Sequence, residues 1–163
     1  MRKAVLEDIS KEYLNAVASY EDEIATQGSS VPLDTFINLA FLYWSFAAEL
    51  FEFVIPNNIP DEWSTIGGER YDLILDKGIQ CYPNSVELHF WKRYFSYRLY
   101  GEDFTEEECI TLLDKYHNED SLVPYFFLYL YDKAKYKEQR DLLIAMCKAQ
   151  PTAKNLYIQS FND

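Results

Sequence analysis

The spacing of apolar residues is the feature that most restricts the fold of this chain. Over residues 3–26, apolar side chains recur every three or four positions, at Leu6, Ile9, Tyr13, Val17, Tyr20 and Ile24. This spacing places them on one face of an amphipathic helix. The same helical spacing continues in later segments, and no sustained run alternates between apolar and polar residues. The sequence therefore predicts an all-α fold of about eight helices.

Proline, glycine and capping residues set the predicted helix boundaries. The expected helices cover residues 3–26, 32–55, 61–82, 84–100, 105–116, 120–135, 137–149 and 151–161. The second is apolar nearly all round, so we expect neighbours on every side of it. Asn84 followed by Glu87 resembles a capping box, and Thr105 with Glu108 forms a better one.

Glycines and prolines also mark weak points and ends. Gly67 and Gly68 stand near the start of the third predicted helix and are expected to weaken or split it. Gly101 has the position of a C-terminal cap, and Pro83 stops the third helix. Asp120 or Ser121 is expected to cap the sixth helix.

Size and cysteine content predict a single globular domain over residues 1–163. A chain of this length, with 48% hydrophobic residues, has enough core to fold without a metal or a disulfide. The three cysteines, Cys81, Cys109 and Cys147, form no C-x-x-C pair. We expect free buried thiols in a reducing compartment. Glu7 and Asp8 interrupt any signal-peptide core, and Glu49 and Glu52 argue against a membrane span at residues 36–55, so a cytoplasmic protein is expected.

The positions of two prolines suggest a repeat. Pro83 and Pro151 are separated by two units of 34 residues, and Gly78 precedes Pro83 by five positions. With Tyr136 opening a second helix, this pattern resembles a degenerate tetratricopeptide repeat over residues 32–161. The middle unit lacks the proline, and the first helices lack the family's Trp-Leu-Gly-Tyr spacing. The resemblance implies antiparallel helix pairs stacked as a superhelix, with repeats at about 32–83, 84–117 and 118–151, flanked by helix 1–27 and a short last helix. An irregular helical bundle is the alternative.

Charge is distributed unevenly along the chain. The net charge is −12, which argues against direct binding of nucleic acid. Residues 12–69 contain ten acidic residues and no Lys or Arg, whereas residues 70–163 contain 15 acidic and 12 basic residues. Such a field can steer a basic partner to the first half of the chain. An acidic surface that only maintains solubility is the alternative interpretation.

These observations define the candidate partner-binding residues. The acidic candidates of the first half are Glu21, Asp22, Glu23, Asp34, Glu49, Glu52, Asp61 and Glu62, and a second acidic group comprises Glu102, Asp103, Glu106 and Glu107. Tyr and Trp are enriched at interface hot spots, so Tyr43 and Trp44 are candidate aromatic anchors. Burial in the second helix is the alternative for these two.

No set of residues for catalysis stands out. His89 and His117 lie on separate segments without a His or Cys partner at ligand spacing. Glu49 and Glu52 form an ordinary acidic turn, and the Gly67–Gly68 pair lacks the context of a phosphate loop. We therefore expect no enzymatic activity, no metal and no cofactor.

In acidity, tyrosine content and absence of a catalytic set, the chain resembles the small acidic immunity proteins of bacterial toxin systems, including contact-dependent inhibition. The resemblance implies a cytoplasmic protein, monomeric before complex formation, that caps the active cleft of a basic toxin domain such as a nuclease. Carboxylates would then occupy the place of phosphates. An acidic tetratricopeptide-like secretion chaperone or adaptor that binds an extended peptide is the alternative. Neither interpretation involves nucleic acid or a membrane.

Overall fold

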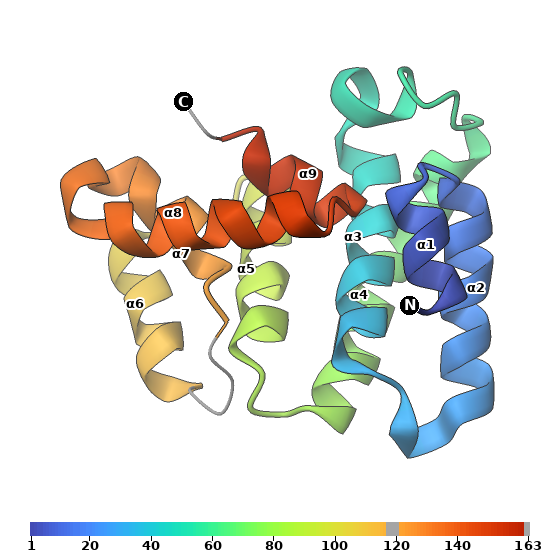
Figure 1. The fold of residues 1–163 in the computed structure, drawn as a ribbon, viewed down its shortest axis with the longest axis horizontal. Coiled ribbons are helices and arrows are strands. Elements are labelled where there is room, and N and C mark those ends of the chain that lie inside the picture. Colours follow the sequence, from blue (N-terminus) through green and yellow to red (C-terminus); the bar gives the residue numbers. More distant parts are fainter. Residues whose placement is uncertain (117–120, 162–163) are drawn as a thin grey trace. The chain divides into compact units, whose positions relative to one another are not determined.

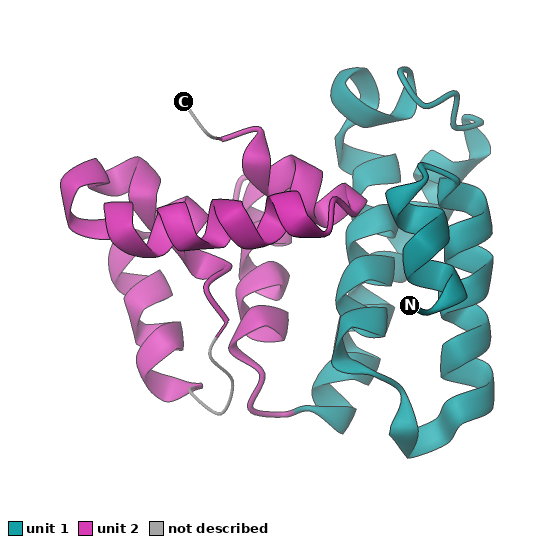
Figure 2. Cartoon of the chain, viewed as in Figure 1, with its two compact units in different colours: residues 1–82 teal, residues 83–163 magenta. Residues whose placement is uncertain are grey.

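The structure is a computed structural model that describes residues 1–116 and 121–161 (Figure 1). Over these residues the chain forms helices, turns and loops without a strand, which confirms the all-α prediction. The chain divides into two compact units, residues 1–82 and 83–163 (Figure 2). The division falls at Pro83, where the third predicted helix was expected to stop.

The first unit contains four α-helices. They are α1 (Lys3–Ile9), α2 (Tyr13–Gln27), α3 (Leu33–Ala48) and α4 (Glu62–Cys81), with a 3-10 turn η1 (Gly28–Ser30) and a π-helical turn η2 (Leu50–Val54). α1 packs on α2, α2 packs on α3, and α3 and α4 run side by side (Figure 1). η2 and the loop after it lie at one end of this unit, between α3 and α4.

The first predicted helix is interrupted, so the expectation of one helix over 3–26 was wrong. Lys11 has a φ of 63°, in the left-handed region, and the chain turns back there between α1 and α2. The turn places α1 against α2, where the buried Asp8 carboxylate accepts a 2.9 Å hydrogen bond from the Tyr20 hydroxyl. The apolar spacing continues through this turn, which is why periodicity alone did not reveal it.

α3 is buried on all sides, as its sequence predicts. Every residue from Thr35 to Phe46 is buried. The helix ends at Ala48, however, rather than near Ile55, and the chain continues into the wider turn of η2. The predicted second helix therefore covers two elements.

α4 is continuous through Gly67 and Gly68, as the predicted helix over 61–82 requires, and the alternative of a split at these glycines does not apply. A Cβ atom on Gly67 would lie 2.1 Å from the carbonyl oxygen of Tyr43, on α3. Gly67 therefore allows the two helix backbones to approach closely. A Cβ on Gly68 would lie 3.6 Å from the Cβ of Ala47, an ordinary contact.

The second unit contains α5 (Val86–Tyr100), α6 (Glu106–Lys115), α7 (Pro124–Tyr131), α8 (Lys133–Ala149) and α9 (Ala153–Gln159). α5 packs on α6, α6 on α7, α7 on α8, and α8 on α9. Together with the α3–α4 pair, this order of neighbours is compatible with a helical-repeat fold. Most aromatic side chains of α5 and α7 form the core: Phe90 and Tyr94 contact Phe126, with ring centroids 5.7 and 5.4 Å apart.

The caps of this unit correspond in part to the prediction. Thr105 caps α6 by accepting a 3.1 Å bond from the Glu108 amide, and Gly101 follows α5 with a φ of 70°. At α5 the capping side chain is Ser85 and not Asn84. Asp132 caps α8, so α7 and α8 meet four residues earlier than expected. The predicted cap at Asp120 lies outside the described residues.

Candidate functional site

Arg2 neutralises part of the acidic first half. Its guanidinium lies 3.0 Å from the Glu23 carboxylate and 2.6 Å from that of Asp34. The Thr35 hydroxyl donates a further 2.6 Å hydrogen bond to Glu23, which is only 8% exposed. Glu23 and Asp34 thus join the N-terminal segment to α2 and α3, and their charges are compensated inside the unit.

A second cationic residue compensates Glu21. Arg70 on α4 lies 2.7 Å from the Glu21 carboxylate, and the Tyr43 hydroxyl donates a 2.6 Å hydrogen bond to the same oxygen. The Arg70 guanidinium also lies over the Tyr43 ring, 5.5 Å from its centroid. Burial, together with the Glu21 carboxylate, raises the pKa of Tyr43. This cluster connects α2, α3 and α4.

The two candidate aromatic anchors are core residues. Tyr43 and Trp44 are 3% and 0% exposed. A partner therefore has no access to either ring on the surface of this unit, and the alternative of burial in the second helix applies. Glu49, the C-cap residue of α3, is buried as well.

The remaining acidic candidates of the first unit are exposed. Asp22 lies on α2, Glu52 on η2, and Asp61 and Glu62 at the start of α4. The last three share one segment, since all stand between the end of α3 and the first turn of α4. These three exposed carboxylates are the predicted partner-binding residues that belong to one segment of the first unit.

The second acidic group belongs to the other unit. Glu102, Asp103 and Glu107 are exposed around the start of α6, and Glu106 is half-buried. Glu108 accepts a hydrogen bond from Arg93, which also donates to the backbone carbonyl of Asp103 at 3.0 Å. Arg93 of α5 therefore lies beside this second acidic group and contributes a positive charge there.

Exposed apolar side chains accompany the acidic segment, and the sequence interpretation missed them. Leu50, Phe51 and Ile55 are 48%, 75% and 57% exposed. The sequence placed them at the end of a fully buried helix. The sequence did contain a signal for this exposure, namely the loop of Pro56, two asparagines and Pro60 that follows. Where the chain turns away into a loop, the neighbouring helices no longer cover the apolar residues just before it.

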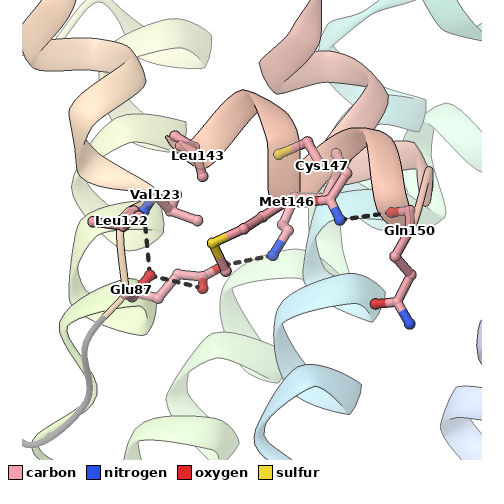
Figure 3. Close-up of a pocket in the computed structure, with 10 residues that line it drawn as sticks. Glu87, Leu122, Val123, Leu143, Met146, Cys147 and Gln150 are labelled. Carbon is pink, nitrogen blue, oxygen red and sulfur yellow. Dashed lines mark hydrogen bonds and ion pairs between the residues drawn. The ribbon is translucent and has the colours of Figure 1, made fainter. Parts of the chain in front are cut away.

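The second unit contains a pocket of about 400 Å³ (Figure 3). Its lining includes Glu87, Leu122 and Val123, the α8 residues Leu143, Met146 and Cys147, and Gln150, which follows α8 (Figure 3). The Glu87 carboxylate in this lining accepts hydrogen bonds from Lys154 at 2.9 Å, from Trp91 Nε1 at 3.0 Å and from Ser121 at 3.2 Å. Because these bonds join α5, α9 and the segment before α7, the carboxylate has a structural role.

Two of the three cysteines, Cys109 and Cys147, are buried, and burial affects the reactivity of their thiols. Burial raises the pKa of the Cys147 thiol to about 11 and that of Cys109 to about 12, which disfavours the nucleophilic thiolate. Cys81 is exposed, contrary to the expectation of three buried thiols, and all three cysteines are free. His89 stacks on Tyr116 with ring centroids 3.8 Å apart, whereas His117 lies outside the described residues.

Two further findings concern metals and membranes. In the part of the chain that the structure describes, no three His, Cys, Asp or Glu side chains are grouped so that they could hold a metal ion. No described helix has both the length and the hydropathy to cross a membrane.

The chain was compared with known proteins. No known protein family, curated protein or solved structure matches it. The tetratricopeptide-like and immunity-like features are thus resemblances of pattern and composition.

Proposed function

We propose that the chain is a cytoplasmic protein-binding protein that neutralises a basic toxin domain, in the manner of a bacterial immunity protein. The observation that supports this best is the exposed acidic segment between α3 and α4, with Glu52, Asp61 and Glu62. It lies within a stretch of 58 residues, 12–69, that contains no Lys or Arg. A basic cleft is the surface that complements such a segment.

The mechanism is electrostatic steering followed by occlusion. An uncompensated acidic surface raises the rate of encounter with a basic domain, and this effect falls with ionic strength. Carboxylates docked in a cleft that normally holds phosphates then block access of the substrate. This role needs no catalytic group on the chain.

The experiment measures binding to a folded basic domain encoded beside this gene. Association and dissociation rates are determined at about 50 mM and about 500 mM salt. The test variant is Glu52→Lys/Glu62→Lys, whose positions are exposed. Reversal at Glu21 or Glu23 is avoided, since it would break the pairs with Arg70 and Arg2 and destabilise the unit. The matched control is Asp114→Lys/Glu138→Lys, which reverses two charges at exposed acids on α6 and α8.

The effect of charge reversal on the association rate should depend on the salt concentration. We expect the test variant to associate about tenfold or more slowly at low salt, with a smaller difference at high salt. Equal rates for wild type, variant and control at both ionic strengths would refute acidic docking. Binding of the unfolded domain or its peptides instead of the folded domain would favour the alternative, an acidic secretion chaperone or adaptor, which the consecutive helix pairs also suit.

A further inference from the structure

The turn η2 presents three apolar side chains to solvent on one face. The Ile55 amide donates a 2.9 Å hydrogen bond to the Leu50 carbonyl, five residues back. In such a π-helical turn, residues four and five apart are neighbours, so Leu50, Phe51 and Ile55 lie together. We call these three residues the apolar tip. Phe51, at 75% exposure, is the most exposed of them.

The opposite face of η2 fixes this orientation. Phe53 packs on Tyr13 and on Phe46, with ring centroids 4.8 and 6.0 Å apart. Val54 is buried, and its carbonyl accepts a 3.0 Å hydrogen bond from the Ile59 amide. Because the inward residues are held by the core, the apolar tip cannot turn inward without breaking these contacts. Exposed apolar residues gathered in this way mark interaction sites.

Exposed carboxylates belong to the same segment as the apolar tip. Glu52 lies within η2, Asp61 is the N-cap residue of α4, and Glu62 is its first residue; these three residues are called the acidic rim. Phe46 contacts both Phe53 and Trp63, the latter with ring centroids 5.8 Å apart. Phe53 and Trp63, which directly follow Glu52 and Glu62, therefore both contact the Phe46 ring. This shared contact places η2 and the start of α4 next to each other.

The negative charge of the acidic rim indicates which kind of partner can bind to this surface. A second copy docked by the same face would bring Glu52, Asp61 and Glu62 against their own equivalents, and like charges oppose such a contact. An anionic membrane surface would repel the rim in the same way. A basic amphipathic segment is complementary to both the apolar tip and the acidic rim.

We propose that the apolar tip and the acidic rim form one docking surface for a basic amphipathic helix of a partner protein. Its apolar face covers Leu50, Phe51 and Ile55, and its Lys and Arg side chains lie against the rim. This inference rests on the proposed function in one respect, the basic nature of the partner. It adds that apolar contact with η2, and not charge alone, holds the partner.

The test uses a defined probe with the full chain. The probe is a fluorescent peptide of about four helical turns, with Leu on one face and Lys on the other. One comparison peptide replaces Leu by Ser, and another replaces Lys by Glu. Phe51→Ser is the test variant, and Leu73→Ser is the matched control, because Leu73 is 60% exposed on α4 of the same unit. Circular dichroism and melting temperature verify that both variants remain folded.

We expect the Leu/Lys peptide to bind and Phe51→Ser to weaken it about tenfold or more, with no change for Leu73→Ser. Both comparison peptides should bind at least about tenfold more weakly. Equal behaviour of the two variants would overturn the proposal, as would tight binding of the Leu/Glu peptide. Self-association of the wild type that Phe51→Ser abolishes would overturn it too, with a second copy as the occupant.

The outcomes separate this proposal from the proposed function. If the neighbouring basic domain binds in a salt-dependent way but Phe51→Ser leaves its dissociation rate unchanged, the toxin-binding role stands and the apolar docking surface is refuted. If the peptide binds through Phe51 while no basic domain is neutralised, the docking surface stands and the immunity role is refuted.

Discussion

Replacing Gly67 by alanine should destabilise the first unit, although alanine is the better helix former. The added Cβ would lie 2.1 Å from the Tyr43 carbonyl oxygen and 3.1 Å from the Phe46 Cβ. The first of these atoms is backbone on a buried helix, so no side-chain rotation relieves the clash. An ordinary Cβ contact begins at about 3.4 Å, so α3 and α4 must separate by about 1.3 Å or more.

The magnitude follows from two opposing effects. Alanine in place of glycine favours the helix by about 1 kcal/mol. A gap of more than 1 Å removes about half or more of the dispersion energy of the contacts across it, and overpacking a core typically costs about 1–3 kcal/mol. Because the clash is with the backbone of a buried helix, we place the cost at the upper end, about 3 kcal/mol, and expect a net loss of about 2 kcal/mol in the free energy of unfolding.

Gly68→Ala is the matched control. Its Cβ would meet Ala47 at 3.6 Å, so only the gain in helix propensity should remain, up to about 1 kcal/mol of stabilisation. Urea unfolding followed by tryptophan fluorescence suits this comparison, since Trp44 and Trp63 belong to this unit. If the two variants had equal midpoints, close backbone packing at Gly67 would not be the reason for that glycine.

Two further predictions concern buried groups. Lys154→Ala should lower the stability of the second unit by about 3 kcal/mol in a thermal melt, because it breaks a buried ion pair by removing the cation at 2.9 Å from the Glu87 carboxylate; a loss below about 0.5 kcal/mol would contradict this. Burial, with a contribution from Asp8, raises the pKa of Tyr13 to about 12. Its contribution to stability is therefore present below about pH 10 and is lost as the pH rises toward 12, by about 1–2 kcal/mol, and Tyr13→Phe should reduce this alkaline loss in urea titrations.

The parts of the fold that sequence predicts are those controlled by local chemistry. Thr105 caps α6 and Gly101 ends α5, because each acts on backbone groups within a few residues. The turn at Lys11 and the close approach at Gly67 depend on which helices meet in space. Apolar spacing carries no information about that, so both were missed.

The candidate surface was predicted in part for a similar reason. The count of charges identified an acidic segment, but Arg2 and Arg70 stand just outside it in sequence and pair with acids inside it. These pairs join residues 21 and 49 positions apart, which a count along the chain cannot show. The apolar tip was missed because its residues are as apolar as those of α3. They follow α3 in the sequence, but the helices that bury α3 do not cover them.

Acidic residues that form ion pairs within the unit should stabilise the fold, whereas exposed acidic residues should affect binding of a partner. Glu23 is buried and binds both Arg2 and Thr35, so Glu23→Gln should lower the free energy of unfolding by about 1–3 kcal/mol. Glu62 is exposed at the start of α4, and Glu62→Gln should change stability by less than about 0.5 kcal/mol. The order should reverse for the association rate with a basic partner, which Glu62→Gln slows at low salt. If instead Glu23→Gln slowed association at unchanged stability, the compensated carboxylates near Arg2 would belong to the docking surface and the division by pairing would be wrong.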